Sequence, residues 1–289
     1  MNVPRFPEFK SVGLEDRDVI QPYIDLYAPE VCEMNFANTF IWRQFDYPRF
    51  TFINDNLCLL FDPPNESDYF LQPMGCTDLP GTILTCLSLA PRLSRIPASF
   101  ASRYCSGLRC APDRDNFDYV YATSDLIELK GKKFDGKRNR INKFERCYAY
   151  KYFCLTPDHL QDCRRLFEEW LIGKDQANCT IQAQKDAIGE GLTHFEALRL
   201  AGGAIEVEGK IAAFSIGGRL SAETAVIHIE IVNPKYEGLA QLMNREFVRN
   251  ELAAYALINR EQDLGLPGLR RAKLSYHPHH LVEKYGISK

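Results

Sequence analysis

The stretch that decides the fold is Ile227-His228-Ile229-Glu230-Ile231-Val232-Asn233-Pro234-Lys235-Tyr236-Glu237-Gly238-Leu239-Ala240. Its first residues alternate apolar and polar side chains, which predicts a strand with one buried face. The Pro and Gly that follow predict a turn. Residues 238–253 then carry apolar side chains at four-residue spacing, which predicts a helix. The chain therefore steps from a half-buried strand into a helix through a short turn.

Two polar side chains stand out on this strand. His228 and Glu230 alternate with isoleucines, so both are expected in one row on the face opposite those isoleucines. A His and a Glu near the end of a strand can hold a substrate amine or move a proton. They are the candidate catalytic residues. The alternative is a partly exposed strand with ordinary alternation.

The turn after the strand is a candidate phosphate site. Lys235-x-x-Gly238-x-Ala240 opens the predicted helix. Small residues there let backbone N–H groups approach a phosphate, and the helix N-terminus adds favourable partial charge. The candidate ligand-binding residues are Asn233, Lys235, Gly238, Leu239 and Ala240. The alternative is a turn whose small residues serve packing.

The rest of the chain predicts two halves of similar order. The second half reads as strands near 150–155, 203–207, 211–216, 225–232 and 257–259, with helices between them. The first half reads as strands near 50–53, 57–61, 69–71, 98–104 and 118–122, with a helix over 79–91. This order predicts an α+β fold of two mixed sheets flanked by helices. The seam is expected near 125–147, giving an N-terminal domain over 1–128 and a C-terminal domain over 129–289.

A basic run lies at this seam. Residues 130–146 hold eight Lys or Arg and two acidic residues, whereas the whole chain has a net charge of −3. Apolar residues at helical spacing predict a connecting helix over 132–147 whose wide face is basic. Such a face suits a ligand that carries phosphate. The candidates are Lys132, Lys133, Lys137, Arg138, Asn139 and Lys143. The alternative is a solvated helix between two domains.

A polar run follows the short strand at 257–259, where α/β sheets usually place ligands. Asn259, Arg260, Asp263 and the later Tyr276 are therefore candidate substrate-binding residues. The alternative is a capped loop in which Asp263 accepts hydrogen bonds from nearby backbone N–H groups. Three histidines lie close together at 277–280, but no carboxylate has the spacing of a metal site, so no metal is expected.

Composition limits the class of protein. The chain has 289 residues of which 45% are hydrophobic, enough to bury real cores. Its acidic balance argues against coating nucleic acid by bulk charge. The N-terminus has no apolar signal region, and no apolar stretch reaches the roughly 18 residues of a membrane span. The ten Cys include no C-x-x-C pair, which predicts reduced thiols in a cytoplasmic protein.

Several motifs together resemble a known family. They are Phe117-Asp118-Tyr119-Val120-Tyr121, Gly131-Lys132-Lys133-Phe134, Lys137-Arg138-Asn139-x-x-Asn142-x-Phe144, His228-x-Glu230, Asn259-Arg260-Glu261-x-Asp263-x-Gly265 and Lys273-x-Ser275-Tyr276-x-Pro278. This pattern resembles a bacterial family of unknown function related to the C-terminal domain of phosphatidylglycerol lysyltransferase. The resemblance implies tandem acetyltransferase-like (GNAT) folds, similar in build to the Fem-type aminoacyl transferases.

The resemblance also implies where a donor would bind. In single GNAT domains a Gln/Arg-x-x-Gly-x-Gly/Ala loop holds the pyrophosphate of acyl-CoA, and Lys235-x-x-Gly238-x-Ala240 stands at that place. The first half has no such loop, so its domain is expected to be degenerate and the active site to lie in the C-terminal domain. The family pattern has a Lys after His-x-Glu, whereas this chain has Ile231.

The implied function is an acyl or aminoacyl transferase. The donor would be aminoacyl-tRNA or acyl-CoA, with no tightly bound cofactor, and the acceptor an amine or hydroxyl of a small molecule, lipid or peptide. Glu230, alone or with His228, would take the proton from the acceptor. With aminoacyl-tRNA, the basic helix would hold its phosphates. The alternative is a ligand-binding relative that has kept the fold and lost the chemistry.

Overall fold

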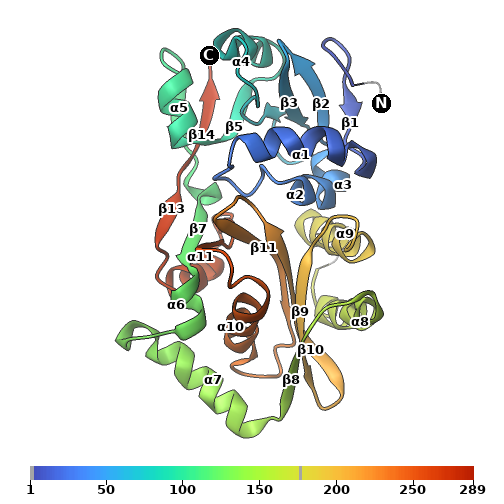
Figure 1. Ribbon diagram of the computed structural model, residues 1–289, viewed down its shortest axis with the longest axis vertical. Helices are drawn as coiled ribbons and strands as arrows, with labels where there is room; N and C mark the ends of the chain where they lie inside the picture. The colour runs from blue at the N-terminus through green and yellow to red at the C-terminus, as the bar shows by residue number, and fades with distance from the viewer. Residues whose placement is uncertain (1–2, 176–177) are drawn as a thin grey trace. The chain divides into compact units, whose positions relative to one another are not determined.

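The computed structural model describes residues 3–175 and 178–289, which form two compact units (Figure 1). The first unit comprises the residues up to Asp118 together with Gln262–Pro267 and Leu281–Lys289. The second comprises Tyr119–Glu261 and Gly268–His280. Each unit holds one mixed sheet with helices packed against it. The expected α+β fold with two such sheets is confirmed.

A mixed sheet forms the first unit. Its strands, in spatial order, are β1 (Lys10–Ser11), β2 (Arg49–Ile53), β3 (Asn56–Phe61), β4 (Tyr69–Phe70), β5 (Arg92–Pro97), β14 (Lys284–Ser288) and β6 (Arg109–Pro112). β2 and β3 form an antiparallel hairpin. Its turn residues Asn54 and Asp55 have φ of 50° and 61°. Asn and Asp tolerate this left-handed conformation, which matches the twist of the strands.

The helices of the first unit are α1 (Arg17–Leu26), α2 (Phe36–Ile41), α3 (Arg43–Asp46), α4 (Leu79–Leu89) and α5 (Ala98–Tyr104). The predicted helix over 79–91 is therefore confirmed. The strand predicted over 98–104 is wrong, because this segment is α5. Phe100 and Tyr104 lie four residues apart, and their rings meet at 4.9 Å on one helix face. Phe100 is buried in the core with Ile83 and Leu93.

The division between the units differs from the one expected at 128/129. The first stretch of the first unit ends at Asp118, and the C-terminal segment Leu281–Lys289 also belongs to this unit. β14 is the reason, because it lies between β5 and β6 and pairs with both of them. A central strand makes hydrogen bonds on both edges, so it belongs to the sheet that it completes.

A second mixed sheet carries the strand of the strand-to-helix step at 227–240. Its strands, in spatial order, are β13 (His280–Val282), β7 (Asp118–Ala122), β12 (Leu257–Asn259), β11 (Thr224–Val232), β10 (Lys210–Arg219), β9 (Ala201–Val207) and β8 (Tyr150–Cys154). β8 to β11 are antiparallel neighbours. β11 and β12 are parallel and are joined through α10 (Leu239–Glu251), because parallel neighbours need a crossover connection.

The remaining helices of the second unit are α6 (Thr123–Glu128), α7 (Asp135–Cys147), α8 (Leu160–Leu171), α9 (Cys179–Thr193) and α11 (Pro267–Leu274). Short 3-10 helices lie at Leu14–Asp16, Arg114–Asn116, Lys132–Phe134 and Pro157–His159. Figure 1 shows α8 and α9 on the side of the sheet opposite to α10. None of the helices in the described part of the chain is long and apolar enough to cross a bilayer.

Two irregularities at β11 shape the site. β12 pairs with β11 over Thr224–Val226, so the last residues of β11 run on beyond these pairs. On the other edge, the register steps from Ile216↔Ile229 to Gly217↔Ile227. His228 is therefore the extra residue of a β-bulge. Bulges interrupt the alternation of a strand and redirect a side chain.

Candidate active site

Glu230 and Arg260 form an ion pair beyond the last β11–β12 pairs. Arg260 Nη2 lies 3.4 Å from Oε1 and 3.3 Å from Oε2 of Glu230. Asn244 on α10 donates from Nδ2 to Glu230 Oε2 at 3.4 Å. The side chain of Arg260 is 14% exposed and that of Glu230 is 22% exposed. The pair is thus mostly removed from water.

Two tyrosines border the guanidinium of Arg260. The Arg260 Cζ atom lies 4.9 Å from the ring centroid of Tyr276 and 5.8 Å from that of Tyr121. Tyr121 donates from its hydroxyl to the carbonyl of Lys273 at 2.8 Å, which fixes its ring. Burial raises the pKa of Tyr276 to about 12, although Arg260 acts in the opposite direction. Both phenols are therefore neutral at physiological pH.

One nitrogen of Arg260 has no partner. Nη1 is buried and makes no hydrogen bond with any residue that the structure describes. Burial lowers the pKa of this guanidinium, but the charge of Glu230 and the tyrosines more than offset that effect, so the net shift is upward. A buried cationic donor without an acceptor is costly, because it has lost its hydration without a replacement. The site therefore lacks an acceptor oxygen that a ligand can supply.

Lys137 on α7 approaches the same cluster. Its Nζ lies 2.5 Å from Ser275 Oγ and 4.2 Å from the ring centroid of Tyr276. Burial, together with the charges of Arg140 and Arg260, lowers the pKa of Lys137 to about 8. Three cationic side chains thus act on one another around Tyr276. This positive potential favours an anionic group such as phosphate.

Most of the other basic candidates are engaged with nearby carboxylates. Lys133 pairs with Asp125 at 3.0 Å, and Lys143 pairs with Glu237. Arg138 binds Asp135 and the backbone carbonyls of residues 129 and 131. Lys132 and Asn139 are exposed. From the predicted phosphate-binding run, the structure therefore brings Lys137 to the Glu230–Arg260 pair and leaves the others on the surface of the helix.

His228 lies at the bulge of β11. Its Nδ1 atom is 2.8 Å from Glu261 Oε1, and its side chain is 1% exposed. Its second nitrogen, Nε2, is buried and unpartnered within the described part of the chain. The expectation that His228 and Glu230 share one row assumed regular pairing with β10, whereas His228 is the extra residue of the bulge.

The turn at 233–240 is shaped by packing. Asn233 Oδ1 accepts a hydrogen bond from the backbone N–H of Lys235 at 3.0 Å, and Leu239 is fully buried. Gly238 has φ of 92°, and a Cβ there would lie 2.3 Å from the carbonyl oxygen of Arg140 on α7. Ala240 is half-buried. These contacts explain the small residue at 238 without a bound phosphate.

Two polar candidates after β12 hold the backbone. Asn259 Oδ1 accepts from the N–H of Glu261 at 2.7 Å. Asp263 is buried in the first unit, where it binds Arg114 at 3.3 Å and the N–H of Gly265 at 2.9 Å. Asp263 thus has the capping role of the alternative interpretation. The other two candidates, Arg260 and Tyr276, are in contact with each other.

Reasoning from the sequence missed four residues of the cluster: Tyr121, Asn244, Glu261 and Lys273. Tyr121, Glu261 and Lys273 stand within the quoted motifs, so their positions were visible. Asn244 carried no signal beyond its place on a helix. Lys273 is buried, and its Nζ binds the carbonyl of Glu261 at 3.0 Å and that of Arg260.

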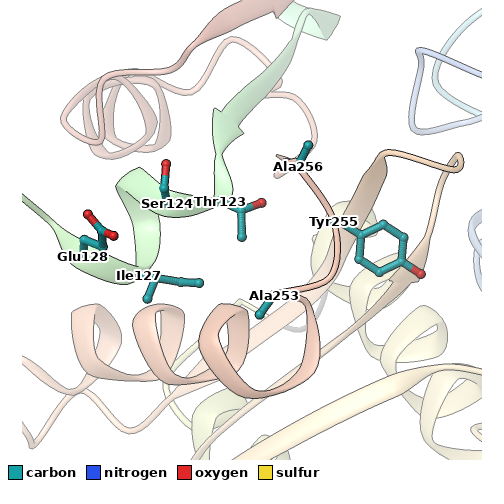
Figure 2. A pocket seen from close by; sticks show the side chains of 7 residues that line it. All are labelled: Thr123, Ser124, Ile127, Glu128, Ala253, Tyr255 and Ala256. Atoms are coloured by element: carbon teal, nitrogen blue, oxygen red, sulfur yellow. The ribbon is translucent and has the colours of Figure 1, made fainter.

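A cavity elsewhere in the second unit is separate from this cluster. Figure 2 shows its lining side chains beside α6 and the segment after α10. Its volume is ≈ 380 Å³. It is lined by Thr123, Ser124, Ile127, Glu128, Ala253, Tyr255 and Ala256. Neither Glu230 nor Arg260 is among these residues, so the cavity is not the predicted site.

A group of potential metal ligands lies in the first unit. Ligand atoms of Cys32, Glu33 and Asp118 lie within 4.8 Å of one another. The ammonium of Lys284 lies among them, 2.6 Å from Glu33 and 2.7 Å from Asp118. Its charge serves the carboxylates as a cation would, so this group is an ion-pair cluster.

Comparison with known proteins identifies the relatives of this fold. A crystal structure of a conserved protein of unknown function from Bacteroides thetaiotaomicron is 33% identical, with a TM-score of 0.89 over 97% of this chain and 98% of that one. The structure of L-PGS from Bacillus licheniformis is 17% identical, with a TM-score of 0.67 over 100% and 94%. FemX matches at 7% identity, with a TM-score of 0.58 over 96% of each chain. The expected resemblance to these folds is confirmed.

The sequence comparisons agree. An uncharacterized protein of Mycoplasmoides gallisepticum is 23% identical over 176 residues, which cover 58% of this chain. This chain spans about half, 54%, of the length of that curated relative. The family model described as phosphatidylglycerol lysyltransferase, C-terminal, matches residues 24–288. The chain therefore belongs to the family of phosphatidylglycerol lysyltransferase C-terminal domains.

Proposed function

We propose that the second unit transfers an activated acyl or aminoacyl group to an amine or hydroxyl acceptor. The observation that carries the proposal is the unpartnered Nη1 of Arg260, buried beside Glu230 and two tyrosines. A buried donor without a partner can bind the carbonyl oxygen of the acyl group. It then stabilises the negative charge that develops on this oxygen during attack.

The reaction needs one proton acceptor and a place for the carrier of the acyl group. The nitrogen or oxygen of the acceptor attacks the carbonyl carbon and loses its proton, and the ester or thioester bond to the carrier breaks. Glu230 and His228 are the two groups on β11 that can take the proton. Lys137, with Arg140 and Arg260 nearby, is suited to a phosphate of the carrier.

We propose an aminoacyl-tRNA donor ahead of acyl-CoA. The family description and the fold shared with L-PGS and FemX support aminoacyl transfer. The packing role of Gly238 weakens the case for a pyrophosphate loop at that turn. The family description also makes phosphatidylglycerol the first acceptor to try. Ile231 stands where the family pattern has a Lys, so the amino acid that is transferred is to be determined by experiment.

The test is a transfer assay with purified chain, aminoacyl-tRNA or acyl-CoA, and vesicles that contain phosphatidylglycerol. Transfer from aminoacyl-tRNA to the lipid is expected, and transfer from acyl-CoA is not. tRNA binding should weaken with salt with the shallow slope of about two or three phosphate contacts, because Lys133, Arg138 and Lys143 are already paired. Lack of transfer from every donor would contradict the proposal.

A second candidate function is ligand binding without turnover. Ile231 at the position of the family's Lys favours it. It predicts that aminoacyl-tRNA or CoA raises the melting temperature while no product forms. The same assay, run beside thermal melts, distinguishes the two functions.

A further inference from the structure

We propose that Nε2 of His228, and not the carboxylate of Glu230, takes the proton from the attacking acceptor, with Glu261 as its positioning residue. The proposal rests on the proposed transferase function and assigns the proton step within it. Its observations are the contact of His228 with Glu261, the free second nitrogen of that imidazole, and the way the backbone holds Glu261.

The contact with Glu261 selects one tautomer of His228. Nδ1 lies 2.8 Å from Glu261 Oε1, and an ionised carboxylate can only accept hydrogen bonds. Nδ1 must therefore carry the hydrogen. Nε2 is buried and has no partner in the described part of the chain, so a hydrogen there would be a buried donor without an acceptor. The favoured neutral ring keeps its lone pair on Nε2, which is the form that accepts a proton.

The backbone around Glu261 is held in place by three groups. Glu261 has φ of 57°, a left-handed conformation that is costly for a residue with a Cβ. Its N–H donates to Asn259 Oδ1 at 2.7 Å. Its carbonyl accepts from the N–H of Tyr119 at 3.2 Å and from Lys273 Nζ at 3.0 Å. These bonds offset the strain and aim the carboxylate at His228.

The bulge in β11 places the imidazole of His228. In a regular strand, His228 would pair with a residue of β10 and alternate with its neighbours. The register step from Ile216↔Ile229 to Gly217↔Ile227 frees it from that pattern. An imidazole on a bulge and a carboxylate on a strained residue thus meet. Bulges and strained residues are both concentrated at functional sites.

Glu230 is less suited to the proton step. Its carboxylate is bound by Arg260 and by Asn244. Protonating it would leave the guanidinium, already removed from water, without its counter-charge. Glu230 therefore serves better to hold Arg260 toward the carbonyl oxygen of the donor.

The step is balanced without a further reactant. As the acceptor nitrogen or oxygen bonds to the carbonyl carbon, its proton moves to Nε2 of His228. The carbon–oxygen or carbon–sulfur bond to the carrier then breaks. The imidazolium, stabilised by Glu261, returns the proton to the leaving oxygen or sulfur.

The first experiment needs no substrate. Long-range ¹H–¹⁵N NMR of histidine-labelled protein reports the tautomer of each of the six histidines, and His228→Gln assigns the signal. We expect Nδ1–H in the wild-type protein and loss of this preference in Glu261→Gln. A wild-type ring with hydrogen on Nε2 would overturn the proposal.

The second experiment measures transfer. His228→Gln should lower kcat by about 10²–10⁴-fold, and Glu261→Gln by on the order of tenfold or more with little change in KM, whereas Glu261→Asp should recover part of the loss. The matched control is Glu190→Gln on α9. Glu190 Oε2 lies 3.2 Å from His194 Nε2, so this change also alters a His–Glu contact, and it should leave kcat unchanged. Thermal melts check that each variant folds.

The outcomes separate the two proposals. Wild-type transfer that survives in His228→Gln would overturn the proton step and leave the transferase function standing. Absence of transfer by the wild-type protein from every donor would overturn the transferase function, and the proton step with it.

Discussion

At the residue scale, Arg260 is the side chain on which the proposed binding of the acyl group depends. Its Nη2 contacts Glu230, while Nη1 is buried without a hydrogen-bond partner in the described part of the chain. Only a planar guanidinium offers separate nitrogens to two acceptors, here Glu230 and the proposed acyl group. The single ammonium of Lys does not have this geometry. A change of Arg260 to Lys therefore keeps the charge and removes the geometry.

We expect Arg260→Lys to lower kcat for transfer by about 10²–10³-fold, the usual effect of removing one donor to a developing oxyanion. The measurement is the rate of single-turnover transfer at saturating donor. Arg146→Lys on exposed α7 is the control, and it should transfer at the wild-type rate. Equal rates for Arg260→Lys and wild type would show that this guanidinium does not contact the reacting group.

Lys137 should make donor binding depend on pH. Burial lowers its pKa to about 8, so it carries its charge below that pH and loses it above. The KM for a phosphate-bearing donor should therefore rise between about pH 7 and pH 9. Lys137→Arg keeps the charge throughout this range and should flatten the profile, because an Arg side chain does not deprotonate there. A rise of the same size in the variant would contradict the assignment.

At the element scale, the contact of α10 with α7 explains a glycine that a motif would assign to phosphate. Gly238 begins α10 in a left-handed conformation, against the carbonyl of Arg140. The side chain that is missing at Gly238 would occupy the space that α7 fills. The sequence pattern of a phosphate loop and that of close helix packing look alike, because both need a residue without a Cβ.

We expect Gly238→Ala to lower the free energy of unfolding by on the order of 1–3 kcal/mol, because a Cβ at φ 92° and 2.3 Å from a backbone oxygen forces a shift. Urea denaturation measures it. Gly136→Ala, within α7 and with nothing inside 4 Å of the new Cβ, is the matched control. It should stabilise by roughly 0.5–1 kcal/mol. A neutral Gly238→Ala would contradict the packing explanation.

At the scale of the whole molecule, the C-terminal strand completes the first unit. Lys284 on β14 is fully buried, and its ammonium binds Asp118 and Glu33. Burial lowers its pKa, but Asp118 and the neighbouring groups more than offset this, so the pKa is raised and the charge persists. This ion pair joins residues that lie more than 160 positions apart in the sequence.

We expect Lys284→Met to lower the free energy of unfolding by about 3–5 kcal/mol, because it leaves buried carboxylates without a counter-charge. Lys289→Met at the exposed C-terminal residue is the control and should change stability little. Chemical denaturation followed by circular dichroism measures both. A loss below about 1 kcal/mol for Lys284→Met would show that the carboxylates are compensated otherwise.

Comparison of the elements shows what could be predicted. The strand-to-helix step at 227–240 and the basic helix near 132–147 follow from local periodicity, and both are present as β11 with α10 and as α7. Residues 98–104 were misassigned because Phe100 and Tyr104, four residues apart, fall on one side of a strand as well as on one face of a helix. The bulge at His228 leaves no mark in the sequence, since it depends on pairing with β10.

The sequence by itself determined the strand-to-helix step at 227–240, the basic helix, the two mixed sheets and the candidates His228, Glu230 and Arg260, because these depend on the period of side chains and on local motifs. Only the tertiary structure decided which candidates meet. It paired Glu230 with Arg260 and His228 with Glu261, bound four of the eight Lys and Arg of the basic run to carboxylates, and placed β14 in the first sheet. The physical reason is that charges pair, and strands hydrogen-bond, according to distance in space, which local sequence does not contain.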